Sequence, residues 1–336
     1  MAGRNPNRSQ PLTPLANFAT LCRSLVVGEA KRKREAILNG PCPCGTAKAA
    51  RECCFTGRCW HKPATPLGLR DLPATTVVER CYMGELGSCV APISGEHLIS
   101  ASVIEVLQGD GGFSISGVPW LAKGEERVLG PKSLRANCLC AKHNSALSPI
   151  DNAARYFFLS LKTYLEADVG EPRHALVSGH DLERWLLKTA KALAASGNLS
   201  RGKEKLSGAF AQDHALIAML DDPVAWPEGS GLYCLMNVGD LMVNHSRFQL
   251  VPWTDEKDEI VALQVNILGF TYLLLLERLD TAKYPLLANA KYRPGRIDVL
   301  YPTSQSWVTF SWEDDLVHDA LQVKFVQRVP RDVGRA

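Results

Sequence analysis

Closely spaced cysteines constrain the fold of this chain more than any other feature. With one histidine they form two sets of four ligands, which are Cys42, Cys44, Cys53 and Cys54, then Cys81, Cys89, Cys140 and His143. Proteins use such thiolate and imidazole sets to close a tetrahedron around Zn²⁺. We expect a cytoplasmic protein, because the first residues lack the apolar stretch of a secretion signal, and cysteines in a reducing compartment serve metals more than disulfides. The sequence therefore predicts two structural zinc sites.

Composition favours a folded protein with no membrane part. The chain has 336 residues, of which 46% are hydrophobic and 22% are charged, which suits two packed domains. The longest apolar run, 260–276, is interrupted by Gln264, Asn266 and Gly269, and its alternation indicates strands rather than a membrane span. The net charge is only +3, so affinity for nucleic acid would have to come from local basic patches.

The first ligand set lies in a very short segment, 41–54, with two cysteines on either side of a turn at Gly45. A unit this small has almost no core of its own, so metal binding would supply its folding energy. The segment resembles the SEC-C motif, in which Cys-Pro-Cys-Gly is followed several residues later by Cys-Cys or Cys-His. Thr46 and Ala47 stand where that motif usually has Ser and Gly. The resemblance implies a zinc motif over residues 39–62 that docks on protein partners, ribosomes or nucleic acid.

The second ligand set brackets a candidate catalytic dipeptide, Glu96-His97, and Asn144 directly follows its last ligand. Phosphodiester hydrolysis needs a base to activate water and a cation to hold the phosphate. His97 suits the base because its pKa lies near working pH, and Glu96 and Asn144 offer oxygen ligands for Mg²⁺ or Mn²⁺. Each also has a simpler interpretation: His97 as an ordinary surface or core histidine, and Asn144 as a helix N-cap.

This constellation resembles the zinc-containing members of the HNH endonuclease family, whose core is a ββα-metal fold. In that family a cysteine pair precedes an acid–histidine dipeptide, and a second pair ends in Cys-Asn. The resemblance implies that Glu96 is the acidic ligand, His97 the general base and Asn144 a further metal ligand. It also implies a metal-dependent endonuclease domain over 75–168 that cleaves DNA, with RNA as an alternative substrate, and it covers residues 81–151.

Departures from the HNH pattern keep a second hypothesis open. Ser100 replaces the usual proline, Glu96 the commoner aspartate, and His143 the fourth cysteine, and no asparagine lies in register before the second half-site. Cys138 competes with Cys140 as a ligand, and Asp151 is either a further acidic ligand or a capping residue. The second hypothesis is a non-catalytic zinc scaffold that binds nucleic acid or a protein partner. A third hypothesis gives the C-terminal domain a ligand-sensing role.

Two groups of basic residues have a functional interpretation as contacts to a phosphate backbone. The basic N-terminal segment 1–38 carries four consecutive basic residues, 31–34, in a predicted helix. A predicted helix over 181–195 carries a basic stripe at helical spacing, formed by Arg184, Lys188 and Lys191. The simpler interpretation of both groups is a charged face in contact with water.

The remaining pattern predicts an α+β fold. Pro-rich residues 63–73 are expected to form a linker, and Ser148 with Pro149 predicts the start of a helix that joins the nuclease-like domain to the rest. The C-terminal domain, 169–336, mixes helix with alternating apolar segments. Strands are expected at 232–237, 247–251, 260–268, 270–276, 296–300 and 307–312. They predict one antiparallel sheet with one buried face.

Overall fold

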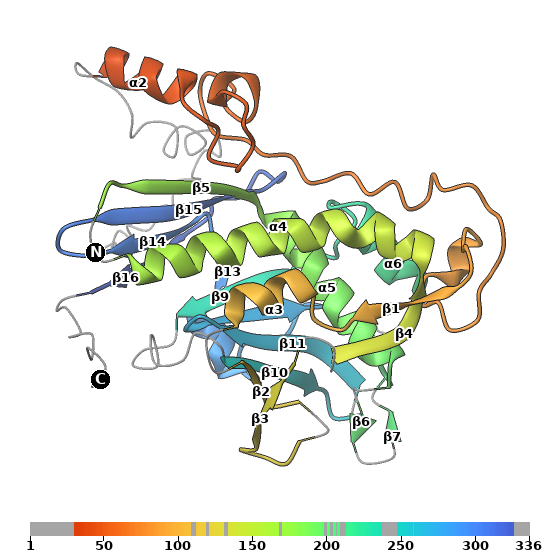
Figure 1. Ribbon diagram of the computed structural model, residues 1–336. Helices are drawn as coiled ribbons and strands as arrows, with labels where there is room; N and C mark the ends of the chain where they lie inside the picture. Colours follow the sequence, from red (N-terminus) through yellow and green to blue (C-terminus); the bar gives the residue numbers. More distant parts are fainter. Residues whose placement is uncertain are drawn as a thin grey trace, which may run out of the picture.

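The protein folds as α+β, as the sequence predicts, with long helices packed between two sheets (Figure 1). The computed structural model describes residues 30–108, 112–118, 121–130, 134–167, 170–197, 200–201, 204–205, 207–208, 213–236, 247–257 and 259–325. The helices are α2 (Ala30–Asn39), α3 (Ala101–Leu107), α4 (Ala141–Glu166), α5 (Gly179–Ala195) and α6 (Asp213–Asp221), with short 3-10 turns η1 (Ala50–Glu52), η2 (Gly84–Leu86) and η5 (Pro285–Asn289).

The strands form two large and two small sheets. The large sheets use β2 (Phe113–Ser116), β3 (Glu126–Leu129), β5 (Arg173–Ser178), β8 (Ser207–Gly208), β9 (Gly231–Met236), β10 (Arg247–Thr254), β11 (Glu259–Ile267), β12 (Phe270–Leu275), β13 (Lys291–Tyr292), β14 (Arg296–Leu300), β15 (Gln305–Ser311) and β16 (Ala320–Lys324). One has the order β13-β9-β12-β11-β10-β2-β3 with β8 on β11, and the other has the order β16-β14-β15-β5. The small sheets pair β1 (Ile93–His97) with β4 (Arg135–Cys140) and β6 (Ser200–Arg201) with β7 (Glu204–Lys205).

The expected single antiparallel sheet is wrong, because the predicted strands divide between two sheets. Strands β10, β11 and β12 form an antiparallel meander, and β9 pairs with β12. The β14–β15 hairpin instead pairs in parallel with β5 on one side and β16 on the other. Parallel pairing joins segments far apart in the chain, such as residues 173–178 with 306–311. Alternation in a strand shows which side chains are buried and leaves the neighbouring strand unspecified.

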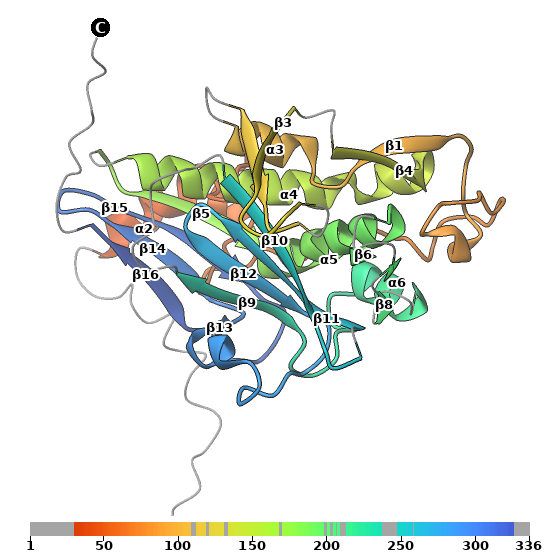
Figure 2. The ribbon, with the colours of Figure 1, turned by 90° about the horizontal axis from the view of Figure 1, so that it is seen from below.

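Helix α4 lies between the two large sheets, and the view from below shows the strands of the larger sheet crossing it and α5 (Figures 1 and 2). Phe157 of α4 contacts Tyr272 of the larger sheet and Phe310 of the smaller one, with ring centroids 6.0 and 5.3 Å apart. Phe158 contacts Trp185 of α5 at 5.4 Å. One continuous hydrophobic core therefore joins both sheets to the two helices.

Helix α5 is buried along nearly its whole length, which makes the expectation of a water-exposed basic stripe wrong. Arg184, Lys188 and Lys191 are 0, 2 and 7% exposed. The helix contacts α4 and α6 as well as strands of both large sheets, so no side of it faces water. Its charged side chains are instead matched inside the protein: Arg184 pairs with Asp181 and also donates to the carbonyl of Leu220 at 3.2 Å.

Helix α4 begins at Ala141, so the predicted helix start at Ser148 and Pro149 is wrong. Its N-cap is Cys140, whose sulfur accepts a hydrogen bond from the backbone N–H of His143. Pro149 lies inside the helix and cannot donate to the carbonyl of Ser145 four residues earlier. The Ser148 hydroxyl donates to that carbonyl at 2.8 Å and replaces the missing bond. The Ser148-Pro149 pair, which predicts a helix start, therefore lies within a helix, where the serine hydroxyl replaces the hydrogen bond that proline cannot donate.

Other short-range predictions meet mixed outcomes. The local sequence predicts a short strand at 98–99, a helix at 101–107 and, from the alternation of apolar residues, a strand at 113–118. The helix and the second strand are found as α3 and β2, whereas the first strand lies earlier, as β1. Residues 31–34 lie in α2, but their side chains fall outside the described part of the chain, as do all of residues 1–29.

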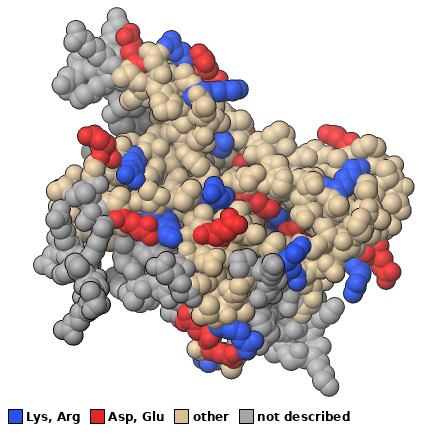
Figure 3. Space-filling model, viewed as in Figure 1, with Lys and Arg blue, Asp and Glu red and all other residues tan. Residues whose placement is uncertain are grey.

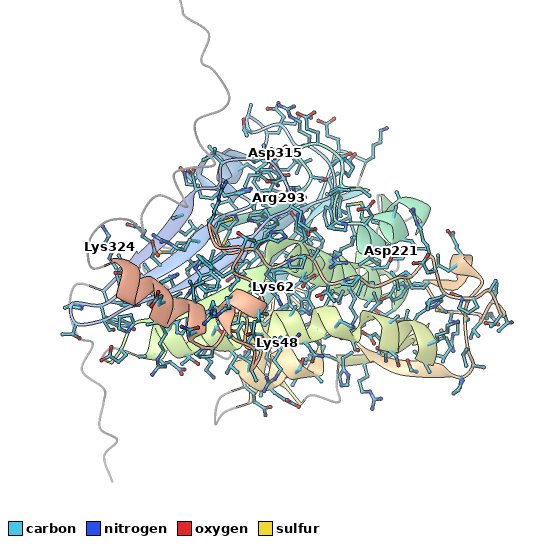
Figure 4. The ribbon with its side chains drawn as sticks, turned by 90° about the horizontal axis from the view of Figure 1, so that it is seen from above. Lys48, Lys62, Asp221, Arg293, Asp315 and Lys324 are labelled. Carbon is cyan, nitrogen blue, oxygen red and sulfur yellow. The ribbon has the colours of Figure 1, made fainter. Side chains whose placement is uncertain are left out.

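The segment expected to be a linker is bound along the protein as an extended strap, residues 62–73 (Figure 4). Thr65 donates twice to Asp181 of α5, from its N–H at 2.9 Å and its hydroxyl at 2.8 Å. Further along, the N–H of Leu69 donates to Asp221 of α6 at 2.7 Å, and the Leu69 side chain is fully buried. These hydrogen bonds fix where the first zinc motif sits relative to the core.

Candidate metal centres and the site around His97

The first ligand set converges as predicted. The sulfur atoms of Cys42, Cys44, Cys53 and Cys54 all lie within 4.8 Å of one another. Cys44 Sγ lies 3.5 Å from Cys53 Sγ, which lies 3.6 Å from Cys54 Sγ. Four sulfurs about 2.3 Å from a tetrahedral Zn²⁺ would lie about 3.8 Å apart, so this geometry suits zinc.

Local sequence explains this convergence. Gly45 has φ +83°, a left-handed conformation that lets the chain reverse directly after Cys44. Thr46 Oγ1 lies 3.4 Å from Cys44 Sγ and 3.3 Å from Cys53 Sγ. Burial would raise the pKa of Cys44, but the hydrogen bonds from Thr46 and the neighbouring thiols outweigh it and lower that pKa to about 6. A lowered pKa favours the thiolate, which is the form in which cysteine binds a metal.

The first zinc motif is docked on the core. The carbonyl of Pro43 accepts hydrogen bonds from the Leu176 N–H of β5 at 2.7 Å and from the Tyr156 hydroxyl of α4 at 2.6 Å. Trp60 contacts the ring of His174 at 5.3 Å, in a T-shaped arrangement. Figure 1 shows this motif and α2 above the four-stranded sheet. Its protein partner in this structure is therefore the chain's own sheet and helix.

The second ligand set converges on His143. Its Nδ1 atom lies 3.4 Å from Cys81 Sγ, 3.7 Å from Cys89 Sγ and 3.4 Å from Cys140 Sγ. A tetrahedral Zn²⁺ with ordinary bond lengths would place nitrogen and sulfur ligands about 3.6 Å apart. The opposite ring nitrogen, Nε2, lies 2.8 Å from the hydroxyl of Ser88. A hydrogen bond on that nitrogen fixes the ring orientation and is the usual partner of a metal-bound histidine.

The structure selects Cys140 over Cys138 as the third sulfur. Cys140 ends β4, and His143 lies in the first turn of α4, so both side chains reach the same point. Cys138 lies two residues earlier on β4 and is not in the cluster of ligand atoms. Burial raises its pKa to about 12, as befits a neutral thiol in the core. Both zinc sites predicted from the sequence therefore have the geometry that zinc requires.

The carboxylate of the candidate catalytic dipeptide faces the protein interior. Glu96 is 3% exposed, and its Oε1 lies 2.8 Å from the ammonium nitrogen of Lys188 on α5. The same nitrogen lies 2.6 Å from Asp151 Oδ2. Ser100 donates to the other oxygen of Asp151 and accepts a hydrogen bond from Trp185 Nε1 at 2.8 Å. A buried cluster with two carboxylates and one ammonium thus lies directly behind the candidate site.

Charge balance explains the pKa directions in this cluster. Burial alone would lower the pKa of Lys188, but Asp151 and Glu96 outweigh it and raise that pKa, so the ammonium stays charged. Burial raises the pKa of Glu96, and the attraction of Lys188 only partly opposes this. Two carboxylates share one cation, so Glu96, the more deeply buried of the two, holds its proton more readily than a free glutamate does.

His97 ends β1 opposite Arg135 of β4. Its imidazole is half-buried, and among the described residues its ring nitrogens make no hydrogen bond. Burial lowers the pKa of His97, and the charges of Arg135 and Lys188 lower it further. The ring is therefore neutral at pH 7 and able to accept a proton.

Asn144 lies in the first turns of α4, where its Nδ2 donates to the hydroxyl of Ser94 on β1 at 3.1 Å. Ser94 in turn donates to the carbonyl of Leu139 on β4 at 3.0 Å. Asn144 is not the N-cap, because Cys140 holds that position. Its amide joins the helix to the β1–β4 sheet, which is a positioning role.

Sequence reasoning missed three residues that shape this site. Lys188 belongs to a stripe whose helical spacing is the same for a water-exposed and a buried face, so the sequence carries no sign of its buried partners. Arg135 and Ser88 carried no signal, because their partners depend on strand register and on the fold around His143.

Comparison with known proteins identifies no relative. No protein-family model matches the chain, and neither a curated protein nor a solved structure matches it. Within the part of the chain that the structure describes, no helix combines the length and apolar character needed to cross a membrane.

Proposed function

We propose that this protein is an HNH-type phosphodiester hydrolase built on two structural zinc sites. One observation carries the proposal: a neutral, half-buried His97 ends β1, and β1 pairs with β4, which leads into α4 through a zinc ligand set. A ββα-metal core likewise has a strand pair that leads into a helix, and here α3, β2 and β3 lie between the two paired strands in the chain. The sequence resemblance and the local topology therefore support the same assignment.

His97 acts as the general base in this proposal. Its free ring nitrogen accepts a proton from water, whose oxygen forms the new bond to phosphorus while the bond to the leaving oxygen breaks. Arg135 is exposed beside His97, where its guanidinium donates to the carbonyl of Gly95 at 3.3 Å. It supplies positive charge where a scissile phosphate would approach His97.

A catalytic Mg²⁺ or Mn²⁺ held by Glu96 and Asn144 does not fit this structure. The ammonium of Lys188 already lies 2.8 Å from Glu96 and would repel a divalent cation at the same carboxylate. Asn144 is turned toward Ser94 by its amide hydrogen bond. The proposed mechanism therefore uses no step through such an ion, and the family's metal position is filled here by Lys188.

The proposed substrate is DNA, with RNA as the alternative. The basic stripe of α5 offers no phosphate contacts because it is buried. On the face seen in Figure 3, basic and acidic side chains of the described residues are interspersed rather than gathered by sign. Contact with the sugar–phosphate backbone would therefore centre on Arg135 and its surroundings.

A plasmid-cleavage assay with purified protein tests the proposal, comparing wild type with His97→Ala. Loss of the base should slow cleavage by about 10²–10⁴-fold, with zinc content and melting temperature retained. His61→Ala is a matched control, because this histidine contacts Ser311 beside the strap, far along the chain from His97. Cleavage by His97→Ala at the wild-type rate would refute the assignment of the base.

The second candidate function is a non-catalytic zinc scaffold that binds nucleic acid or a protein. The bridge from Lys188 to Glu96 and Asp151 favours it, because it neutralises the acidic residue that an HNH site uses. Absence of cleavage by a wild-type protein that contains both zincs, with or without added Mn²⁺, would establish this alternative over the hydrolase.

A further inference from the structure

A cavity of about 940 Å³ opens at the N-terminal end of α5, where β9 and β13 of the larger sheet approach the end of β15. Its buried floor is formed by His180, Trp226 and Arg293, and its walls include Tyr233 and Tyr292. This volume falls within the range of about 300–1,000 Å³ that is typical of small-molecule sites. Figure 4 labels Arg293 in this region and Asp315 near it.

The floor of the cavity is a fully matched polar network. Arg293 Nε donates to Glu183 Oε1 at 2.9 Å, and its NH1 group donates to Asp314 Oδ2 at 2.8 Å. Glu183 Oε1 also accepts the N–H of Leu232 at 2.8 Å. Gly231 allows this approach, since a Cβ there would lie 2.4 Å from Glu183 Oε1. The network therefore holds the floor in one arrangement before any ligand arrives.

His180 contributes no charge to this floor. Its Nε2 accepts the backbone N–H of Glu313 at 3.0 Å, so the single ring proton lies on Nδ1, which is 3.1 Å from Glu183 Oε2. A ring that accepts through one nitrogen and donates through the other is neutral.

The charge balance of the lining points to a cation. Two guanidinium groups line the cavity, from Arg278 and Arg293, against four carboxylates, which belong to Glu228, Asp280, Glu313 and Asp314. The lining charge is therefore −2, and Glu183 beneath the floor adds a further negative charge. Arg293 is already bonded to Glu183 and Asp314, which leaves the half-buried Glu313 carboxylate as the main charge still open to a ligand.

The aromatic walls suit the same class of ligand. The hydroxyl of Tyr233 donates to Gly229 O at 3.0 Å, and that of Tyr292 donates to Ser230 O at 3.1 Å. The rings lie 4.8 Å apart at 42°. The guanidinium of Arg293 lies over the Tyr292 ring, 5.2 Å from its centroid, so this wall already holds one cation by the attraction of a cation to an aromatic face. Tyr233 is the aromatic wall left for a ligand.

We propose that this cavity binds a small organic cation that carries an ammonium or guanidinium group. Glu313 would accept its N–H groups, and the Tyr233 ring would contact its charged end. The site lies at the first turn of α5, whereas Lys188 lies near the middle of that helix, and it does not depend on the proposed hydrolase activity.

Isothermal titration of the purified full chain with spermidine and with agmatine tests this proposal, with citrate as the anionic comparison. We expect one cation per chain to bind with a Kd below about 1 mM and citrate not to bind. Glu313→Gln should weaken cation binding about tenfold. Asp315→Asn is the matched control, because Asp315 is exposed next to the lining residues and is not one of them, and it should change Kd less than about twofold.

A second pair of variants keeps the test sharp if Glu313→Gln disturbs the strap, since Glu313 also accepts from the Ala64 N–H at 3.4 Å. Tyr233→Phe keeps the ring and should retain affinity, whereas Tyr233→Leu should weaken it about threefold to tenfold. His97→Ala should bind both cations like wild type, which separates this site from the proposed catalytic one. Absence of binding, tighter binding of citrate, or equal affinity in all variants would overturn the proposal.

Discussion

The ammonium of Lys188 lies 2.8 Å from Glu96 Oε1 and 2.6 Å from Asp151 Oδ2, so a lysine of α5 bridges an acid of β1 and an acid of α4. All three residues come from different elements, and both Glu96 and Lys188 are almost completely buried. The bridge connects the candidate catalytic strand to the central helix of the fold. It also decides whether the candidate site can accept a divalent cation.

Lys188→Met should destabilise the protein by about 3–5 kcal/mol, because it leaves the buried carboxylate of Glu96 and the partly buried carboxylate of Asp151 without a cation. Urea unfolding monitored by circular dichroism measures the loss. The double variant Lys188→Met/Glu96→Gln should recover part of it, since it removes one of the two unpaired charges. Lys283→Met is the matched control, because its partner Glu256 is exposed, and it should leave the unfolding midpoint unchanged. A Lys188→Met protein as stable as wild type would rule out the bridge.

The protein should contain two Zn²⁺ ions per chain by metal analysis. Cys140→Ser should remove one of them and lower the melting temperature, because a structural zinc site supplies folding energy. Cys138→Ser changes the neighbouring buried thiol on the same strand and should retain both ions. The opposite pattern, with zinc lost from Cys138→Ser and kept by Cys140→Ser, would contradict the ligand assignment.

The acid limb of the pH–rate profile should lie below pH 6.5, because 6.5 is the ordinary pKa of histidine and the pKa of His97 is lowered. Burial, Arg135 and Lys188 all lower the pKa of His97, so the neutral base persists to lower pH than it would in a free imidazole. Arg135→Gln removes one of these causes and should move the limb upward, toward 6.5. An acid limb above 6.5 in wild type would mean that another group carries the dependence.

Gly45→Ala should loosen the first zinc motif from the core. Position 45 has φ +83°, and an added Cβ would lie 2.7 Å from the Tyr156 ring. The substitution should cost about 1–3 kcal/mol through backbone strain and displacement of that ring. Gly57→Ala is a useful comparison, because it shares a positive φ but has no atom within 4 Å of its Cβ position. Equal losses in both variants would show that the contact with Tyr156 adds nothing.

Asn144→Ala should lose about 0.5–1.5 kcal/mol, the usual net value of one hydrogen bond, because its amide joins α4 to Ser94. Ser94→Ala should give a similar loss, and the double variant should lose less than the sum, since both remove the same bond. Cleavage by either variant should require no added Mn²⁺, as in the wild type. A raised Mn²⁺ requirement in Asn144→Ala alone would return Asn144 to the role of a metal ligand.

Local sequence was sufficient for the features that depend on short-range spacing. The Cys42–Cys54 set and the set ending in Cys140-x-x-His143 were recognisable because tetrahedral zinc fixes the type and spacing of its ligands. Most predicted strands of the C-terminal half are found near their expected positions, since alternation of apolar residues reflects burial of one face. The α3 helix was likewise predictable from its own residues.

Tertiary structure alone decided the partners of the buried charges and the division into two sheets. The helical spacing shows that Arg184, Lys188 and Lys191 lie on one face of α5. It does not show whether that face meets water or the protein interior, and in the fold it is buried. The partners of Lys188 come from a strand and a helix far away in the chain, and no local sequence pattern identifies them as its partners. Pairing of β5 with β15 and the cavity beside Arg293 arise in the same way, from segments that meet only when the core closes. The sequence by itself determined which residues form the two candidate zinc sites, and the closed fold decided that Lys188 lies beside Glu96, the acid that the HNH resemblance assigns to a metal.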